Sequence, residues 1–512
     1  MRIAGRRLIR PDGHPARRGI KLVLPVQFVA ERKSVPREME WANNRRHPAP
    51  RCGVRGRKSS LQLKGECSYQ NRVMLYERWR ELAGANRQEL ALLELSTGRR
   101  WTFGQLRSAT EQRRNDGHWL VHPQGQSAEF VLEVLRGWRN GRVVCPLEPG
   151  QTPPKIPRPP KTCLHLKTTS ATTGKPRLVA FTTSQLAADA DHIVATMGLR
   201  ADWPNLGVIS LAHSYGFSNL VLPLLLHGIP LVLGHGNLPE AIRQAGKSGR
   251  AWTLPAVPAL WRAWQEAAAI PPNLRLAISA GAPLSAALEQ AVYRSAGLKV
   301  HNFYGATECG GIAYDREPTP RSAEESVGSA MHNVRLAVNA AGCLEVRGPN
   351  VGHTYWPEPE SSLADGCFRT SDLAELRDGQ VFLRGRATDL LNIAGRKVAP
   401  ETIERVLALH PAVKNCLVLG LPGQQADRGE IIAVIISRRG GASVETFRTY
   451  AQRHLPAWQV PREWWLVDRL EPDPRGKLSR SRWREKFLAR LSSPQKSGKS
   501  KSHGRRAGPC SE

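Results

Sequence analysis

The stretch Thr168–Pro176, TTSATTGKP, follows LHLK and gathers five hydroxyl side chains, one glycine and one lysine in nine residues. Hydroxyls and backbone N–H groups in a turn donate hydrogen bonds to anions, and glycine allows close approach to the backbone. The stretch is not a Walker A loop, because Pro176 stands after Gly174 and Lys175 where Ser or Thr is required. Taken alone, it is compatible with either a phosphate-binding loop or a solvated turn.

Four further stretches follow in the chain: NFYGATE (302–308), RTSDLAELRDG (369–379), GRATDLLNIAGRKVAPETIE (385–404) and PRGKLSR (474–480). In this order and spacing, the five stretches resemble the AMP-forming adenylating superfamily, which includes acyl- and aryl-CoA synthetases and peptide-synthetase adenylation domains. The resemblance covers about 165–480. It implies the adenylate-forming enzyme fold, a large α/β N-terminal domain with parallel-type sheets and a small, mobile α+β C-terminal domain.

The resemblance also implies a reaction. A carboxylate attacks the α-phosphate of ATP and expels pyrophosphate, and a thiol then displaces AMP from the acyl adenylate. The implied cofactors are ATP, Mg²⁺ and coenzyme A, with the phosphopantetheine of an acyl carrier protein as the alternative acceptor. Because an anion must approach a polyanion, positive charge has to screen the first step.

Site residues are carried over from the matching motifs. The loop residues implied to bind the β- and γ-phosphates are Thr168, Thr169, Ser170, Thr172, Thr173, Gly174 and Lys175. The resemblance implies that Glu308 binds magnesium and that Thr307 contacts the α-phosphate beside the metal. The rest of the nucleotide site comprises Asn302, Phe303, Tyr304 and Gly305, with Tyr304 against adenine opposite Gly281, Ala282 and Pro283, and Asp372, Arg386 and Lys397 at the ribose and phosphate.

Two catalytic side chains complete the implied site. Lys477 matches the mobile lysine whose ammonium neutralises the attacking carboxylate and the developing phosphate charge. His213 in LAHSYGF matches a position that gates the acyl tunnel. For each of them, and for Tyr304, an ordinary structural role remains the alternative.

Some positions depart from the family pattern. Ala171 stands where glycine is usual, Arg177 and Leu178 stand where Lys-Gly is usual, and Thr388 occupies the hinge where Asp or Lys is usual. These departures motivate a rival interpretation, a degenerate nucleotide-binding module without turnover.

The chain divides into four parts by composition. Residues 1–73 carry 18 Lys and Arg against 5 Asp and Glu, and we expect them to be a disordered or misassigned extension. The AMP-binding N-terminal domain is expected at 74–384, where strand and helix patterns alternate. The C-terminal domain is expected at 385–490, with helices at 400–413 and 443–455, and a disordered basic tail at 491–512.

Charge and hydropathy narrow the class of protein. The net charge of +30 is concentrated at the two ends, since residues 480–512 add 10 Lys and Arg against 2 Asp and Glu. A nucleic-acid-binding protein acting through these ends is a rival, but the mildly basic body makes nucleic acid an unlikely partner.

The longest apolar run, residues 220–234, is too short and too broken by proline to span a membrane. The nine cysteines lack CxxC spacing, which fits reduced thiols in a cytoplasmic protein.

The substrate is open at this level. The segment Ala212–Phe217 and the pair Gly310 and Gly311 are expected to line the acyl pocket, and their small and apolar character favours a fatty or aromatic acid. An amino acid would require an acidic residue for its ammonium group, and none is identified from the sequence.

Overall fold

The computed structural model describes residues 74–112, 117–169, 177–234, 236–247, 249–423, 430–471 and 478–492. The predicted extension at 1–73 and the tail beyond Ser492 lie outside these residues. Residues 74–85 are helical and lead into strand β1 (Leu90–Glu94). The domain expected to begin at residue 74 therefore opens on a helix followed by a strand, as its sequence pattern predicts.

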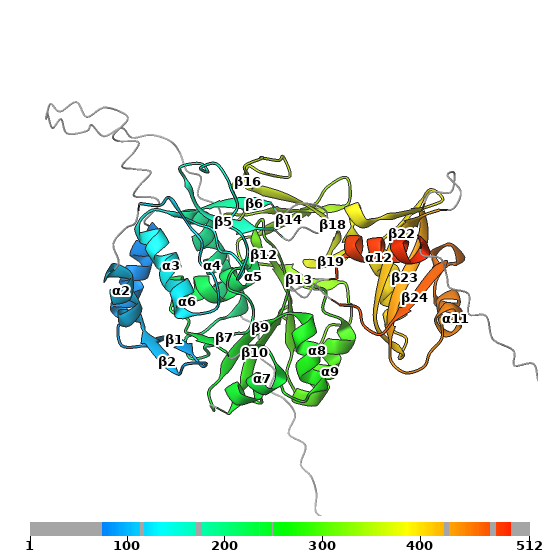
Figure 1. Cartoon of the computed structure of the whole chain (residues 1–512), viewed down its shortest axis with the longest axis horizontal. Helices are drawn as coiled ribbons and strands as arrows, with labels where there is room; N and C mark the ends of the chain where they lie inside the picture. The colour runs from blue at the N-terminus through cyan, green and yellow to red at the C-terminus, as the bar shows by residue number, and fades with distance from the viewer. Residues whose placement is uncertain are drawn as a thin grey trace, which may run out of the picture. The chain divides into compact units, whose positions relative to one another are not determined.

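A parallel sheet forms the centre of the large domain (Figure 1). Its strands are adjacent in the order β1, β8, β7, β9, β10 and β11, and each neighbouring pair is parallel. The further bounds are β7 (Asn205–Gly207), β8 (Leu231–Leu233), β9 (Trp252–Ala256), β10 (Leu274–Ser279) and β11 (Val300–Ala306). Strands β8 and β9 are buried at every position, which explains their nearly continuous apolar sequence.

Helices connect these parallel strands, because a parallel pair cannot be joined by a tight turn. They are α6 (Leu222–His227), α7 (Pro239–Gly246), α8 (Pro258–Glu266) and α9 (Ala286–Ala296). The N-terminal part adds β2 (Arg99–Thr102), α2 (Phe103–Gln112) and α3 (Ala128–Arg139). The apolar run at 220–234 forms α6 and β8 in the core, as expected. Among the described residues, no helix combines the length and apolarity needed to cross a bilayer.

Beyond β11 the same sheet continues with antiparallel strands. They are β12 (Gly310–Tyr314), β13 (Ser326–Ala330), β14 (Arg335–Val338), β15 (Cys343–Arg347), β17 (Leu363–Ala364), β18 (Cys367–Arg377) and β19 (Gln380–Arg386). The alternation of strands and helices predicted across 74–384 therefore stops at α9. Short connections join β11 to β12, β14 to β15 and β18 to β19, since antiparallel neighbours do not need helical crossovers.

A second sheet carries the opening motif. Its order is β16 (Thr354–Trp356), β6 (Leu178–Thr182), β5 (Cys163–Thr168), β4 (Val143–Val144) and β3 (Leu120–Val121). Strands β5 and β6 are antiparallel, and Thr168 pairs with Leu178. The stretch TTSATTGKP therefore begins with the last residue of β5, and β6 begins two residues after it.

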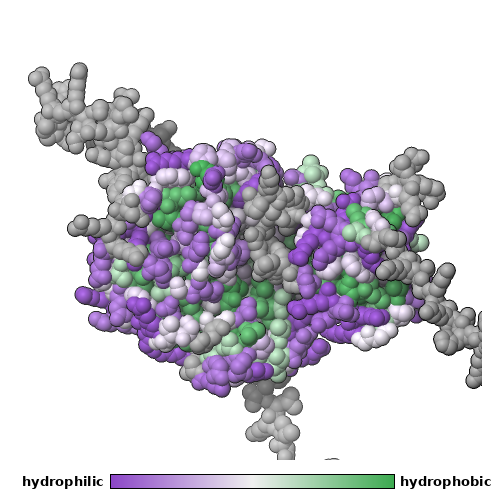
Figure 2. Space-filling view, in the orientation of Figure 1, coloured by the Kyte–Doolittle hydropathy of each residue, from purple (hydrophilic) through white to green (hydrophobic). Residues whose placement is uncertain are grey.

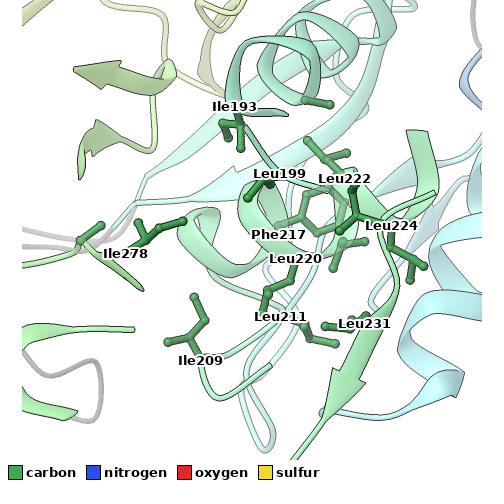
Figure 3. Close-up of a cluster of buried hydrophobic side chains, with 14 of the residues drawn as sticks. Ile193, Leu199, Ile209, Leu211, Phe217, Leu220, Leu222, Leu224, Leu231 and Ile278 are labelled. Carbon is green, nitrogen blue, oxygen red and sulfur yellow. The ribbon is translucent and has the colours of Figure 1, made fainter. Parts of the chain in front are cut away.

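Helix α4 (Thr183–Met197) follows β6 directly. Its N-terminus has a capping box, in which the Thr182 hydroxyl accepts from the backbone of Gln185 and the Gln185 side chain accepts in return. Its apolar side chains pack against α6 and the π-helix η1 (Phe217–Val221), which follows α5 (Ser214–Gly216). Figure 3 shows Ile193 of α4 near Phe217, Leu220 and Leu222 in this core.

The small domain contains a three-stranded sheet with helices. Its elements are η2 (Ala387–Asp389), β20 (Leu391–Ile393), β21 (Arg396–Val398), α10 (Pro400–Ala408), β22 (Val413–Pro422), β23 (Glu430–Arg438), α11 (Val444–His454), η4 (Ala457–Gln459), β24 (Glu463–Val467) and α12 (Arg480–Ser492). Strands β22, β23 and β24 form the sheet, and two apolar clusters pack against it.

Two helices of the small domain were predicted from local sequence signals, and one of them ends earlier than predicted. The helix predicted at 443–455 is α11, and Ser443 caps it by accepting from the backbone of Thr446. Helix α10 ends at Ala408 rather than at 413, because Pro411 disfavours helical geometry in the preceding residue. Helix α12 ends at Ser492, and the boundary predicted at 490 between the domain and the tail stays a prediction. Hydrophilic residues cover much of the coloured face shown in Figure 2.

Candidate active site

A hydrogen-bonded group of three side chains joins two of the predicted motifs. Asp372 on β18 is directly opposite Arg386 on β19, and the Arg386 Nε donates to Asp372 Oδ1 at 2.9 Å. The Tyr304 hydroxyl, from β11, donates to Asp372 Oδ2. Burial raises the pKa of Tyr304 well above its ordinary value, and the negative charge of Asp372 raises it further. The tyrosine therefore stays protonated and is a permanent donor to this carboxylate.

The other residues of NFYGATE hold β11 in place. Asn302 is buried, and its side chain donates to the backbone oxygen of Ser326 at 3.3 Å. The ring of Phe303 packs against the ring of Tyr215, with 5.9 Å between the two ring centroids. A Cβ at Gly305 would lie 2.6 Å from the oxygen of Gly310, so the connection between β11 and β12 requires glycine. The nucleotide contacts predicted for these residues stay predictions.

The loop Gly281–Pro283 follows β10 at the carboxyl end of the parallel sheet. Ser279, the last residue of β10, pairs with Asn302 of β11, so the loop starts beside the NFYGATE motif. Gly281 has a φ of +84°, a left-handed conformation that favours glycine. Ligands of open parallel sheets bind at this end of the strands.

Glu308 lies in the connection between β11 and β12. Its Oε1 accepts a hydrogen bond from the hydroxyl of Tyr355 at 3.0 Å. Burial raises the pKa of Glu308, an effect that the Tyr355 hydrogen bond and the charges of Arg177 and Arg386 only partly offset. Thr307 precedes it and is half-buried.

Glu308 can contribute to a magnesium site only together with ligands from the nucleotide. Among the described residues, no group of three or more His, Cys, Asp or Glu side chains is arranged to hold a metal ion. Mg²⁺, however, is commonly held by one or two carboxylates together with substrate phosphates. A cation close to a carboxylate favours the charged form of that carboxylate. Glu308 therefore fits a metal that is completed by the nucleotide.

The two ends of the phosphate loop are close together. Thr169 donates its backbone N–H to the oxygen of Arg177 at 2.8 Å, and its hydroxyl accepts from the Arg177 backbone at 3.0 Å. The hydroxyl of Thr168 is buried and has no hydrogen-bond partner among the described residues. The predicted residues Ser170, Thr172, Thr173, Gly174 and Lys175, and the departure at Ala171, lie outside the described residues.

The remaining departures from the family pattern have clear surroundings. Leu178 is buried in an apolar cluster with Val143 and Cys145, so its side chain fills the second sheet's core. Arg177 stacks its guanidinium 3.9 Å from the ring centroid of Tyr355 and forms an ion pair with Glu360. Thr388 is exposed in η2.

Lys397 and Lys477 were predicted from the motifs of the C-terminal domain. Lys397 is exposed on β21, in the small domain, and takes no part in the contacts above. Lys477 lies outside the described residues. Their roles stay predictions.

His213 has an acidic partner that sequence reasoning missed. Its Nε2 lies 2.9 Å from Oε1 of Glu148, which also accepts from the hydroxyl of Ser210 at 2.6 Å. Tyr215, two residues on, reaches the backbone oxygens of Ala256 and Ile278 at 3.4 and 3.5 Å. The segment around His213 is therefore anchored at the carboxyl ends of β9 and β10, beside the Gly281 loop.

Gly310 and Gly311 are packed rather than open. A Cβ on Gly310 would lie 2.0 Å from Asp189 Oδ1, and one on Gly311 would lie 2.9 Å from Met331 Cε. Asp189 in turn accepts from Lys167 and Ser218. The described geometry accounts for both glycines by close packing, and their place in the acyl pocket stays a prediction.

A large domain built on a parallel sheet, followed by a small α+β domain, is the architecture of adenylate-forming enzymes. Residues 104–356 match the family model for the AMP-binding enzyme, and residues 402–477 match the model for the AMP-binding enzyme C-terminal domain. The chain therefore belongs to the AMP-forming adenylating superfamily, as the five motifs predict.

Its curated relatives include CoA ligases. A feruloyl-CoA synthase from Amycolatopsis sp is 27% identical over 362 residues, which cover 65% of this chain and 72% of that protein. A probable 2-succinylbenzoate–CoA ligase from Mycobacterium tuberculosis is 28% identical over 329 residues, which cover 61% of this chain and 82% of that protein. The structure of ATP-bound MatB from Rhodopseudomonas palustris has a TM-score of 0.72 at 21% identity and covers 81% of this chain and 99% of that chain. This similarity confirms the predicted fold class.

Proposed function

We propose that the protein activates a carboxylic acid as acyl-AMP, releases pyrophosphate and transfers the acyl group to coenzyme A. The observation that carries the proposal is the convergence of Tyr304, Asp372 and Arg386 with Glu308 beside the phosphate-loop hairpin. These side chains come from separate motifs of one adenylating family, and each suits one part of MgATP. The named CoA ligases among the relatives support coenzyme A as the acceptor.

The proposed first step is displacement at the α-phosphorus of ATP. A carboxylate oxygen of the acid forms a bond to phosphorus, and the bond to pyrophosphate breaks. Asp372 accepts hydrogen bonds from the ribose hydroxyls, and Arg386 holds this carboxylate in place. Glu308 would hold Mg²⁺, which supplies charge neutralisation on the phosphates when it is bound. Lys477 brings an ammonium group to the developing negative charge.

In the second step, the thiol sulfur attacks the acyl carbon and AMP leaves with the carboxylate oxygen. Coenzyme A and a carrier-protein phosphopantetheine present the same thiol, so the chemistry of the step is common to both. Assay of both acceptors with the preformed adenylate separates them. We expect coenzyme A to be the better acceptor, and a strong preference for a holo-carrier protein would overturn that choice.

The acid we propose is fatty or aromatic. The small and apolar segment around Phe217 supports this class. Glu148 beside His213 adds a negative charge that the sequence did not predict near this segment. Amino acids therefore belong in the substrate panel, because an ammonium group could pair with such a carboxylate.

ATP–pyrophosphate exchange with a panel of fatty, aromatic and amino acids tests the proposal. We expect exchange with a fatty or aromatic acid. Exchange with amino acids alone would replace the substrate class but retain the reaction. Tight MgATP binding without exchange for any acid would contradict the proposed activity and favour a degenerate nucleotide-binding module.

A truncated chain lacking residues 1–73 and 493–512 tests the role of the basic ends. Ligase activity should survive the truncation. RNA binding by the full chain that the truncated chain lacks would reveal a separate nucleic-acid function.

A further inference from the structure

One segment of the large domain, Asn350–Trp356, contacts the Glu308 connection at several points. The amide of Asn350, which is fully buried, donates to the oxygens of Cys309 and Gly311 at 2.6 and 3.2 Å. The backbone N–H of Gly352 donates to the oxygen of Glu308 at 2.8 Å. The side chain of Tyr355 then reaches Glu308 Oε1 at 3.0 Å. Both the backbone and the carboxylate of Glu308 are therefore fixed by this segment.

The segment is itself held against the phosphate-loop hairpin. Strand β16 pairs with β6, and Tyr355 is directly opposite Val179. A Cβ on Gly352 would lie 2.7 Å from Val179 Cγ1 and 2.9 Å from the oxygen of Glu308, so only glycine allows this approach. The position of the Tyr355 hydroxyl is thus set by the strand that leaves the phosphate loop.

Arg177 fixes the ring of Tyr355 from one face. Its guanidinium lies 3.9 Å from the ring centroid, and its ion pair with Glu360 orients it there. Arg177 also exchanges two hydrogen bonds with Thr169, which close the base of the loop. A continuous set of contacts therefore runs from the end of the phosphate loop through Arg177 and Tyr355 to Glu308.

We propose that Tyr355 is a positioning residue for Glu308. Its hydroxyl donates a hydrogen bond to Oε1 and so orients the carboxylate, which leaves Oε2 to bind the magnesium of MgATP. The inference rests on the proposed function, in which Glu308 is the metal ligand. Outer partners of metal ligands act in this way in many sites, and their loss typically lowers metal affinity about 10- to 100-fold. Tyr355 does not need to touch the nucleotide.

The test is the effect of Mg²⁺ on ATP affinity in the full-length protein. Calorimetric titration of ATP with saturating Mg²⁺, and again with EDTA, gives the tightening of ATP binding that the metal produces. In Tyr355→Phe this tightening should fall about tenfold, at the low end of the outer-partner range. The affinity for ATP in EDTA should be unchanged. The variant keeps the ring that Arg177 covers and removes only the hydroxyl.

Two further variants separate positioning from general architecture. Tyr293→Phe, on α9, makes the same chemical change outside the site and should behave as the wild type. If Tyr355 acts through Glu308, adding Tyr355→Phe to Glu308→Gln should cause no further loss of the Mg²⁺ effect, as a double-mutant cycle measures. Thermal melting of each ligand-free variant confirms that it is folded.

Each outcome decides the inference. Equal losses of ATP affinity with and without Mg²⁺ would assign Tyr355 a purely structural role and overturn the proposal, as would no change in either condition. If Mg²⁺ does not change the affinity of the wild type for ATP, both this inference and the assignment of Glu308 as the magnesium ligand are overturned. Failure of pyrophosphate exchange in the wild type, with Mg²⁺-dependent ATP binding intact, would overturn the proposed reaction and leave the positioning role of Tyr355 standing.

Discussion

Lys167 and Asp189 form a buried ion pair, with Lys167 Nζ 3.1 Å from Asp189 Oδ2 and both side chains almost fully excluded from solvent. Ser218 accepts from Lys167 at 2.9 Å and donates to Asp189 at 2.6 Å. The other oxygen of Asp189 accepts weakly from the backbone of Gly311 at 3.4 Å. This group therefore links β5, which leads into the phosphate loop, to α4, η1 and the start of β12.

Removing one partner of this ion pair should destabilise the large domain. We expect Lys167→Met to lower the free energy of unfolding by about 3 kcal/mol, because it leaves a buried carboxylate without its counter-ion. The double variant Lys167→Met/Asp189→Asn should recover part of this loss, since no unpaired charge remains. Urea unfolding followed by tryptophan fluorescence measures both changes.

An exposed ion pair provides the control. Arg200 pairs with Asp202 on the surface, and both side chains are more than half exposed. Arg200→Met should leave the unfolding midpoint unchanged. A midpoint for Lys167→Met equal to that of Arg200→Met would show that the buried pair contributes nothing to stability.

Much of the fold is encoded in local signals. The Ser443 cap of α11 and Pro400 in the first turn of α10 each act within a few residues, so the sequence alone predicts helices there. The antiparallel half of the large sheet was not predicted, because pairing of strands such as β13 and β19 depends on residues far apart in the chain. Hydrophobic alternation does not identify a strand's partner.

The candidate site divides in the same way. Asp372, Arg386, Tyr304 and Glu308 were predicted because each belongs to a motif that carries its own pattern. Tyr355, 47 residues from Glu308, belongs to none of those motifs and joins the site only through the pairing of β16 with β6. Its contact is tertiary, and a single sequence contains no periodicity that reveals it.

Asp372 should determine the affinity for the ribose. Two of the acceptor positions of its carboxylate are taken by Tyr304 and Arg386, and the remaining lone pairs can accept from ribose hydroxyls. We expect Asp372→Ala to weaken MgATP binding at least tenfold, since hydrogen bonds to charged groups contribute about 1.5–3 kcal/mol each. Equilibrium titration with ATP and 2′-deoxy-ATP measures this.

The deoxy nucleotide makes that test specific. The wild type should bind 2′-deoxy-ATP more weakly than ATP, and Asp372→Ala should bind the two about equally. Tyr304→Phe keeps the carboxylate and should retain the discrimination. If Asp372→Ala still discriminates as strongly as the wild type, another group recognises the 2′-hydroxyl.

His213 and Glu148 should affect the acid more than the nucleotide. The carboxylate of Glu148 orients the imidazole through its 2.9 Å contact, so removing either group disturbs the segment predicted to line the acyl pocket. We expect His213→Ala to raise KM for the acid several-fold with little change in KM for ATP, and Glu148→Gln to have a smaller effect of the same kind. Steady-state kinetics with each substrate varied in turn distinguishes the two constants. Comparable increases in both would indicate a general structural role.

Lys477 should act in only one of the two half-reactions. Its proposed ammonium group stabilises charge that develops as the acid attacks the α-phosphorus, whereas a thiol attacks the acyl carbon of preformed acyl-AMP and leaves the phosphorus unattacked. Lys477→Ala should therefore abolish pyrophosphate exchange, while coenzyme A still reacts with supplied acyl-AMP at close to the wild-type rate. The conservative variant Lys477→Arg keeps the charge but not the geometry of a compact ammonium, and we expect it to retain a small part of the exchange activity. Equal loss of both half-reactions in Lys477→Ala would refute a role confined to adenylation.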